Sequence, residues 1–542
     1  MSRASQSLSG CRPASGYRTM TSGLIPIVRS DSAGIAIAKP LAVLAKVFSA
    51  GMLGIQAFTV VVEVAVGPGL PGYDLVGHAA HAVREGGVRI RAALANSGFK
   101  LPPRRVTVNL APAGLRKDGA LYDLPIAIAI MAALDLVPRN ALEKLLIVGE
   151  LALDGQLRAI TGGLPIALHS RESRYELVVP LACASEAAVV SELKVHAAAN
   201  LAEVAAFLRG EVALEAPKAL ALPEVHDRLD LADIRGMEPA RRALEVAAAG
   251  GHNLLLIGPP GCGKSMLARR LPSILKPLSE REAIETTCIY SAAGKLEGNA
   301  LLSERPFRSP HQDISVAGLI GGGTSPRPGE LSLAHHGVLF LDELPEFKRS
   351  VLESLRQPLE ERVVTIVRAQ TAVTYPASVT LVAALNPCPC GYRGSSQRVC
   401  ICSDDNVRRY IGRISGPLLD RIDLHIETPH VDYRSLQAER DGEQSVAVRQ
   451  RVFAAQKIQT VRNGASNALL SPRKLRQVCT LDSAADRQLE RCVRRFGLSA
   501  RAVHRVLRVA RTVADLAERP HLLPSDISEA VSLRALDRQT TT

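Results

Sequence analysis

The sequence predicts an α/β protein of several domains that ends in a helical region. From residue 43 to about 210, short β-like runs such as Thr59 to Val64 alternate with helical runs such as Ala80 to Ser97. In the middle of the chain, a strand-like run leads through a glycine-rich loop into a helical run. Beyond residue 430, apolar residues recur almost only at helical spacing. A chain of 542 residues suits about three or four domains of ~150 residues each.

Composition and charge indicate a folded protein with a basic surface. Hydrophobic residues make up 47% of the chain. The sequence contains no uninterrupted run of about 18 apolar residues, so it does not predict a membrane span. The net charge is +13, and residues 431–542 hold 20 Lys and Arg against 12 Asp and Glu. We therefore expect a polyanion as partner; the alternative is a basic surface that only maintains solubility. Ten cysteines without an evident secretory context favour a reducing, cytoplasmic location. Because no long apolar run is present, we expect no membrane partner.

Composition shifts divide the chain into five segments. Residues 1–42 are rich in Ser, Ala and Arg and carry no acidic residue before Asp31. They favour a disordered tail or a start codon placed too far upstream over an organellar targeting peptide. We expect a mixed α/β domain over 43–210, an Ala- and Pro-rich linker over 211–228, an α/β core over 229–430 and a helical domain over 431–542.

The glycine-rich loop matches the phosphate-binding pattern of nucleoside triphosphatases. Its residues are Gly258, Pro259, Pro260, Gly261, Cys262, Gly263, Lys264 and Ser265. Residues 253–257 predict the preceding strand and residues 266–271 the following helix, which is the context that the pattern requires. The loop N–H groups would surround the phosphates of ATP, Lys264 would add positive charge, and Ser265 would bind Mg²⁺. Cys262 is interpreted as a small spacer that makes the loop sensitive to thiol modification.

An acidic pair follows a second hydrophobic strand about eighty residues later. Residues 337–341 predict this strand, and Asp342 and Glu343 follow it directly. We expect Asp342 to hold Mg²⁺ and Glu343 to orient and polarise the attacking water. Alone, a strand that ends in Asp-Glu is usually structural, but together with the loop it predicts hydrolysis.

Two further residues are candidates for contacts with the nucleotide. Asn386 follows a strand predicted over 379–385, so its side chain is expected at the strand tip near the γ-phosphate or water; a turn before Pro387 is the alternative. Arg421 lies between apolar residues, which suits a rigid arginine that reaches a neighbouring subunit. A surface ion pair with Asp423 is the alternative.

Four cysteines form two Cys-x-Cys pairs separated by nine residues, a set sufficient for one tetrahedral Zn²⁺. They are Cys388, Cys390, Cys400 and Cys402. Each pair is tighter than the commoner two-residue gap, so unliganded thiols and a redox pair remain as alternatives.

Three stretches extend these motifs: Arg305 to His311, Pro328 to His335, and Asn386 to Gly391. Through them the sequence resembles AAA+ ATPases of the magnesium-chelatase-like branch, specifically the ComM/YifB group, over nearly everything after residue 43. The resemblance implies a hexameric ring with ATP between subunits, Arg421 as an arginine finger in trans, and Arg501 as a second sensor. Gln312 stands where this group usually has a second His, which puts the contacts of that loop in doubt.

The resemblance also places an insertion (303–330) and a hairpin (363–375) near the pore of the ring. Arg308, His311, Arg327 and Arg368 are therefore candidate contacts to DNA phosphates, with ion pairs within the loops as the alternative.

Residues 43–210 resemble the Lon-protease-type fold, related to ribosomal protein S5 domain 2, through residues 116–121, 149–155 and 162–165. Proteolysis there needs a Ser nucleophile and a Lys base. Leu121 and Pro165 stand at those positions, so we expect a scaffold or binding module without protease activity.

These features together predict an ATP-hydrolysing hexameric DNA motor that resembles the branch-migration helicases of the ComM group, which act in recombination and natural transformation. The alternative is a chelatase-type motor that remodels a protein or metal-insertion partner, although no metal-binding module typical of such partners is evident in the sequence.

Overall fold

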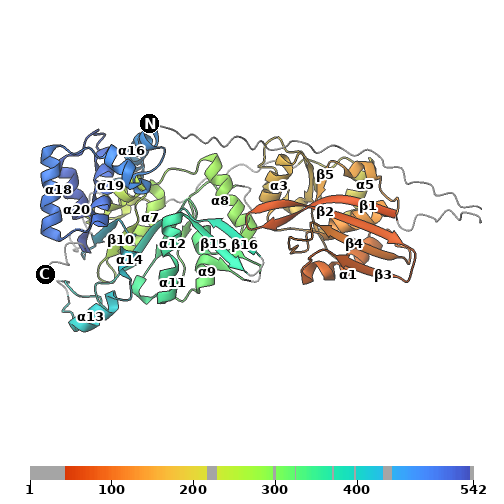
Figure 1. Ribbon diagram of the computed structural model, residues 1–542, viewed down its shortest axis with the longest axis horizontal. Coiled ribbons are helices and arrows are strands. Elements are labelled where there is room, and N and C mark those ends of the chain that lie inside the picture. Colours follow the sequence, from red (N-terminus) through yellow and green to blue (C-terminus); the bar gives the residue numbers. More distant parts are fainter. Residues whose placement is uncertain are drawn as a thin grey trace, which may run out of the picture. The chain divides into compact units, whose positions relative to one another are not determined.

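The computed structural model describes residues 43–216, 229–296, 301–323, 325–368, 371–395, 398–430 and 442–536 (Figure 1). The extension 1–42 and most of the linker expected over 211–228 lie outside these residues. A mixed α/β region, a second α/β region and a helical region follow one another along the chain, and the chain is an α/β protein as predicted.

The N-terminal region, drawn in red to yellow in Figure 1, contains a seven-stranded mixed sheet in the order β3-β4-β2-β1-β5-β8-β9. Antiparallel pairs join β1 to β2 and β2 to β4, and parallel pairs make up the rest of the sheet. The elements are β1 (Val43–Leu53), β2 (Gln56–Gly67), β3 (Gly72–Val76), α1 (His81–Asn96), β4 (Arg105–Ala111), α2 (Asp123–Ala133), β5 (Leu145–Ile147), β6 (Glu150–Leu151), β7 (Leu157–Arg158), α3 (Gly163–Glu172), β8 (Glu176–Pro180), α4 (Ala184–Ala187), β9 (Val195–Ala198) and α5 (Leu201–Leu208).

Helix α2 forms the centre of this region because all eleven of its residues are buried. It packs on β1 and β2, which explains why its sequence is apolar on every side. Asp123 is the exception, and Arg89 of α1 neutralises it through an ion pair of 2.7 Å. Burial nevertheless raises the pKa of Asp123 above its ordinary value, against the lowering effect of Arg89.

The second region contains a five-stranded sheet in the order β11-β14-β17-β10-β18, in which every pair is parallel. Its strands and helices are α6 (Glu238–Gly250), β10 (Leu254–Ile257), α7 (Lys264–Ile274), α8 (Glu280–Ala293), β11 (Phe307–Arg308), α9 (Val316–Ile320), β12 (Gly321–Gly322), β13 (Arg327–Pro328), α10 (Glu330–Leu333), β14 (Val338–Leu341), α11 (Arg349–Ser354), α12 (Arg356–Glu361), β15 (Val363–Arg368), β16 (Thr371–Pro376), β17 (Thr380–Leu385), α13 (Asp404–Ile411), α14 (Gly416–Leu419) and β18 (Leu424–Glu427).

Both faces of this sheet are buried. On β10, Leu254 and Leu256 belong to a hydrophobic core shared with α6, α7 and the C-terminal helices. Leu255 and Ile257 belong to a separate core built with α11 and the β15–β16 hairpin. The continuous apolar strands of the sequence follow from this arrangement, because a parallel sheet is covered on both sides.

The C-terminal region is helical, as expected, and is drawn in blue in Figure 1. It contains α16 (Ser445–Asn463), α17 (Pro472–Val478), α18 (Ser483–Phe496), α19 (Ala500–Leu516) and α20 (Pro524–Ser532). Helix α19 packs on α6 and α16, and the buried pair Arg511 and Asp515 lies on it with a contact of 3.0 Å. Apolar contacts thus join these helices to the sheet of the second region.

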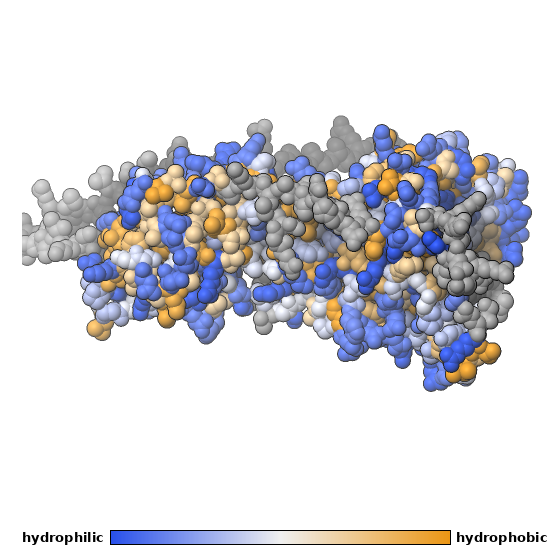
Figure 2. All heavy atoms as spheres, turned by 180° about the vertical axis from the view of Figure 1, so that it is seen from behind, coloured by the Kyte–Doolittle hydropathy of each residue, from blue (hydrophilic) through white to orange (hydrophobic). Residues whose placement is uncertain are grey.

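The visible surface in Figure 2 is mostly hydrophilic, with hydrophobic residues in small, separate groups. None of the helices in the described residues combines the length and the apolar character that a membrane crossing requires.

Candidate nucleotide and metal sites

The phosphate-binding loop lies between the carboxyl end of β10 and the first residue of α7. Gly261 and Gly263 have φ angles of 76° and 84°, in the left-handed region that favours glycine. Gly258 is required for a different reason: a Cβ there would lie 2.3 Å from the carbonyl oxygen of Thr428. The loop therefore begins in close contact with the residue that follows β18.

Lys264 and Ser265 are held by residues from three strand ends. Lys264 is 7% exposed, and its Nζ donates to the Gly258 and Pro259 carbonyls at 2.8 Å each and to Asn386 Oδ1 at 3.1 Å. The Ser265 hydroxyl donates to Asp342 Oδ2 at 2.6 Å. Carboxyl ends of parallel strands meet at one edge of a sheet, which is why residues from β10, β14 and β17 converge. Hydroxyl and carboxylate oxygens fit Mg²⁺, and the loop fits phosphate.

Glu343 has an unusual backbone conformation for its residue type. Its φ and ψ are 51° and 48°, in the left-handed region, and its side chain is exposed. Its backbone N–H donates to Asp342 Oδ1 at 3.0 Å, which orients the Asp342 carboxylate relative to the Glu343 backbone. Strained residues of this kind cluster at functional sites.

Arg421 lies at the opposite edge of the sheet from the loop. Its carbonyl accepts from the Asn253 side chain at 2.8 Å, beside the amino ends of β10 and β18. Its guanidinium pairs with Glu360 at 2.7 Å and donates to the Pro417 carbonyl at 2.6 Å. The expected alternative partner, Asp423, instead lies 3.5 Å from His252 and accepts from the Asn253 N–H at 3.3 Å.

Arg501 is also distant from the loop of its own chain. It lies in the first turn of α19, is 78% exposed on its side chain, and approaches Asp420 at 3.9 Å. Arg421 follows Asp420 directly in the chain, so the structure brings the two candidate arginines to the same sheet edge. It does not bring either of them to Lys264.

The four cysteines expected to bind metal lie together. Cys388, Cys390 and Cys400 have Sγ–Sγ distances of 3.3, 3.6 and 3.6 Å, and the ligand atoms of all four lie within 4.8 Å of one another. All nine cysteines in the described residues are free thiols. Backbone N–H groups of Tyr392 and Ile401 lower the pKa of Cys390 to about 6.

The basic residues proposed as DNA contacts differ in their surroundings. Arg308 forms two hydrogen bonds with the Glu330 carboxylate, at 2.6 and 2.9 Å, which favours the interpretation as a loop ion pair. His311 is exposed and lies 3.3 Å from Asp313. Arg327 and Arg368 are exposed. Arg327 lies on the two-stranded ribbon opposite Gly322, and Arg368 Nη2 lies 3.6 Å from the Cβ position of Gly322, so these two arginines share one surface.

In the N-terminal region, Leu121 and Pro165 are both buried. Neither side chain carries a nucleophile or a base, so these positions offer no protease chemistry. Lys117 nearby is fully buried and donates to the Pro112 carbonyl, and burial lowers its pKa.

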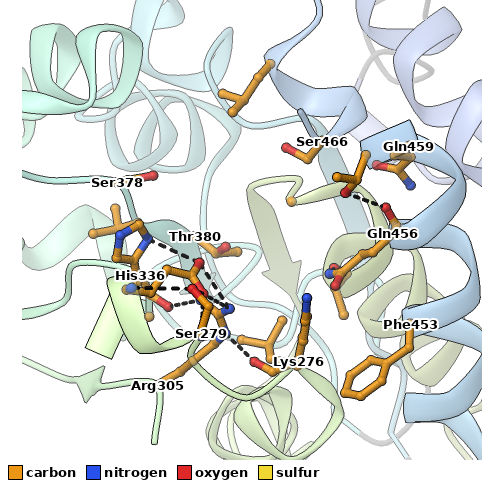
Figure 3. A pocket seen from close by; sticks show the side chains of 18 of the residues that line it. Lys276, Ser279, Arg305, His336, Ser378, Thr380, Phe453, Gln456, Gln459 and Ser466 are labelled. Atoms are coloured by element: carbon orange, nitrogen blue, oxygen red, sulfur yellow. Dashed lines mark hydrogen bonds and ion pairs between the residues drawn. The ribbon is translucent and has the colours of Figure 1, made fainter. Parts of the chain in front are cut away.

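A cavity of about 690 Å³ lies at the amino ends of β14 and β17 (Figure 3). His336, Ser279 and Arg305 line one side, and Phe453 and Gln456 of α16 line the other. The phosphate-binding loop does not contribute to it, so we do not assign the nucleotide to this cavity.

Comparisons with known proteins follow the same three regions. Residues 230–436 match the family described as "Magnesium chelatase, subunit ChlI", residues 62–182 match "Subunit ChlI of Mg-chelatase", and residues 442–534 match "Magnesium chelatase, subunit ChlI C-terminal". Competence protein ComM of Haemophilus influenzae is 45% identical over 502 residues, which cover 91% of this chain and 98% of that protein. The chain belongs to the ComM/YifB family.

Two further relatives extend this comparison. YifB of Escherichia coli is 44% identical over 488 residues, covering 90% of this chain and 96% of that protein. Lon protease 2 of Bacillus subtilis is 31% identical over 144 residues, 24% of this chain and 25% of that protein. This ComM/YifB chain is thus a magnesium-chelatase-type AAA+ ATPase, and this class uses ATP with Mg²⁺.

Sequence reasoning missed several neighbours of the site in this ComM/YifB protein. Thr428 contacts the loop through its hydroxyl, 3.2 Å from Cys262 Sγ. Glu360 holds Arg421, and Tyr410 forms a hydrogen bond with the backbone of Asn386. Burial raises the pKa of Tyr410 to about 12, so its hydroxyl stays protonated. No motif marks these residues, because the folded chain alone brings them to the site.

Proposed function

We propose that this protein is a ring-forming DNA motor that hydrolyses ATP between adjacent subunits. The observation that carries the proposal is the position of Arg421, at the sheet edge opposite the phosphate-binding loop of its own chain. An arginine finger at that edge can act only on the nucleotide of a neighbouring subunit. Head-to-tail contacts of this kind close into rings, and we propose a hexamer.

Each residue of the site has a proposed role. The loop amides and Lys264 bind the phosphates, and Mg²⁺, held by Ser265 and Asp342, neutralises the charge that develops on them. Glu343 orients and polarises the water. The Asn386 amide, 3.1 Å from Lys264 Nζ, reports on the γ-phosphate, while Arg421 and Arg501 of the next subunit stabilise the transition state.

The proposed DNA contacts are Arg327 and Arg368. Both are exposed, and both lie around Gly322 on neighbouring β-ribbons. Paired cations on ribbons of this kind fit a phosphate backbone without reading its sequence. The relative ComM is named a competence protein. We propose incoming single strands or recombination intermediates as substrates of this chain, and branch migration as its activity.

A branch-migration assay tests this function. Three- and four-stranded DNA substrates are incubated with the protein and either ATP or a non-hydrolysable analogue. Strand exchange should require ATP hydrolysis, and Lys264→Ala should abolish it, whereas the exposed Lys100→Ala should behave like wild type. Exchange that survives in Lys264→Ala would refute the motor assignment.

A second candidate function rests on the family descriptions, which name a magnesium chelatase subunit. In that case the ring would remodel a protein or metal-insertion partner. DNA binding measured over a salt series separates the two, because phosphate contacts weaken steeply with salt. Double replacement of Arg327 and Arg368 by Ala should reduce the salt slope by about 2 if each neutralises one phosphate.

Zn²⁺ is the third proposed cofactor, at Cys388, Cys390, Cys400 and Cys402. Four thiols within 4.8 Å of one another supply a complete tetrahedral ligand set.

A further inference from the structure

The four cysteines lie directly beside the nucleotide site rather than on a remote surface. Cys388 is two residues after Asn386, the residue that contacts Lys264. We use the name cysteine loop for residues 388–395 and 398–402. The Sγ–Sγ distances of 3.3 to 3.6 Å approach the ~3.8 Å edge of a tetrahedron with Zn–S bonds of about 2.3 Å. They are much longer than a disulfide bond of ~2.05 Å.

Interactions within the cysteine loop hold this arrangement. The Gly391 N–H donates to the Cys388 carbonyl at 2.9 Å, and the Arg393 N–H donates to Cys388 Sγ at 3.4 Å. Arg393 also pairs with Asp404 at 2.8 Å, which ties the first cysteine pair to the helix after the second pair. N–H groups directed at a sulfur stabilise a thiolate and are typical outer contacts of a metal site.

The cysteine loop touches the phosphate-binding loop at one point. A Cβ atom on Gly391 would lie 2.6 Å from Cδ of Pro260, a separation that side chains do not reach. Gly391 therefore packs on Pro260 only because it has no side chain. The other end of the cysteine loop leads into α13, where Tyr410 forms a hydrogen bond with the backbone of Asn386. The cysteine loop thus starts two residues after Asn386, and the helix that follows it returns to contact Asn386.

We propose that one Zn²⁺ bound by Cys388, Cys390, Cys400 and Cys402 holds the cysteine loop against Pro260 and Asn386, so that ATP binding depends on the metal. The proposal rests on the ATP-binding role of the phosphate loop given above, and it extends that role to a structural ion outside the catalytic residues. Loss of the metal would release the contact of Gly391 with Pro260 and would let the backbone after Asn386 move.

Zinc content and nucleotide binding test the proposal without any DNA substrate. Wild type should contain about one Zn²⁺ per chain, and the pair of changes Cys400→Ser and Cys402→Ser should remove it. The control Cys492→Ser alters a buried cysteine of α18 outside the cluster and should retain zinc. Removal of zinc from folded wild type by a chelator, followed by titration with a fluorescent ATP analogue, avoids dependence on how well the cysteine variants fold.

Two glycine substitutions test the contact itself. Gly391→Ala and Gly394→Ala both place a side chain at positive φ, 84° and 76°, but a Cβ on Gly394 meets nothing within 4 Å. Both variants should keep their zinc. Gly391→Ala should weaken nucleotide binding about tenfold, and Gly394→Ala by less than about threefold, because the new Cβ on Gly394 meets no neighbour.

The outcomes decide whether ATP binding depends on the bound zinc. Wild type that binds ATP without containing zinc, or chelated protein that keeps its affinity, would overturn the proposal. Equal effects of the two glycine variants would overturn the contact through Pro260. A protein that passes these tests but fails in branch migration would leave the metal coupling supported and would count against the DNA motor alone.

Discussion

Replacement of Arg421 by Ala should abolish ATP hydrolysis without unfolding the protein. Strand β10 has four residues and separates the edge of Arg421 from the phosphate-binding loop by roughly 13 Å at ~3.3 Å per residue. Arg421 therefore acts, in our proposal, on the ATP of the next subunit. Loss of an arginine finger should slow hydrolysis by about 10³-fold or more, equivalent to about 4 kcal/mol of transition-state stabilisation.

The stability cost of this change is expected to be much smaller. The Arg421 side chain is 16% exposed and pairs with Glu360, whose side chain is 63% exposed, so the pair is open to solvent on the Glu360 side and contributes about 0–1 kcal/mol to folding. The control Arg494→Ala removes an ion pair in which both partners are exposed, with Glu490 at 2.6 Å, and should leave hydrolysis unchanged. Thermal unfolding of both variants should resemble that of wild type.

Subunit mixing tests the geometry. Arg421→Ala subunits keep an intact loop, and Lys264→Ala subunits keep an intact finger, so mixed interfaces combine the two functional halves. Random mixing in equal amounts should restore roughly a quarter of the interfaces in a head-to-tail ring. Absence of recovery, with mixed rings demonstrated by mass spectrometry, would refute action in trans.

Three other changes test separate features. Glu343→Gln should retain ATP binding but lower the rate constant of hydrolysis by about 10²-fold or more, because the water loses its base; unchanged turnover would contradict the role. Gly258→Ala should abolish binding of a fluorescent ATP analogue, since the new Cβ would lie 2.3 Å from the Thr428 carbonyl; normal affinity would contradict the contact. Burial lowers the pKa of His335 to about 4, below its value in the unfolded chain. Because the unfolded chain then takes up the proton more readily, the folded state has its full stability above ~pH 6.5 and loses stability as the pH falls toward 4. Urea unfolding at about pH 7.5 and about pH 5 should differ by about 2 kcal/mol more in wild type than in His335→Gln, and equal differences would exclude this effect.

Local sequence patterns predict the residues of the nucleotide site. The long-range contacts that bring these residues together could not be predicted from the sequence. The loop from Gly258 to Ser265 and the pair Asp342 and Glu343 each follow an apolar strand, so their places at strand ends could be read from the sequence. Their convergence requires β17 to lie between β14 and β10, which sequence order does not reveal. The structure supplies this order.

The same distinction explains the remaining differences. Arg308 was a candidate DNA contact because its charge is visible in the sequence, but its partner Glu330 reaches it only after α10 is placed. The spacing of the four cysteines predicts a ligand set, yet the contact of Gly391 with Pro260 joins residues more than a hundred positions apart. No periodicity or motif encodes such a contact.

Strand β18 has a nucleotide site at each end if subunits assemble as we propose. Its carboxyl end leads to Thr428, whose carbonyl oxygen leaves no room for a side chain at Gly258. Its amino end follows Arg421, which in our proposal acts on the ATP of the neighbouring subunit. Four residues paired along their whole length with β10 form a stiff connection. A shift of the loop when ATP binds or leaves would thus move the finger offered to the next subunit. ATP hydrolysis would then proceed from one subunit to the next around the ring, because the nucleotide state of each subunit would control hydrolysis in the subunit after it.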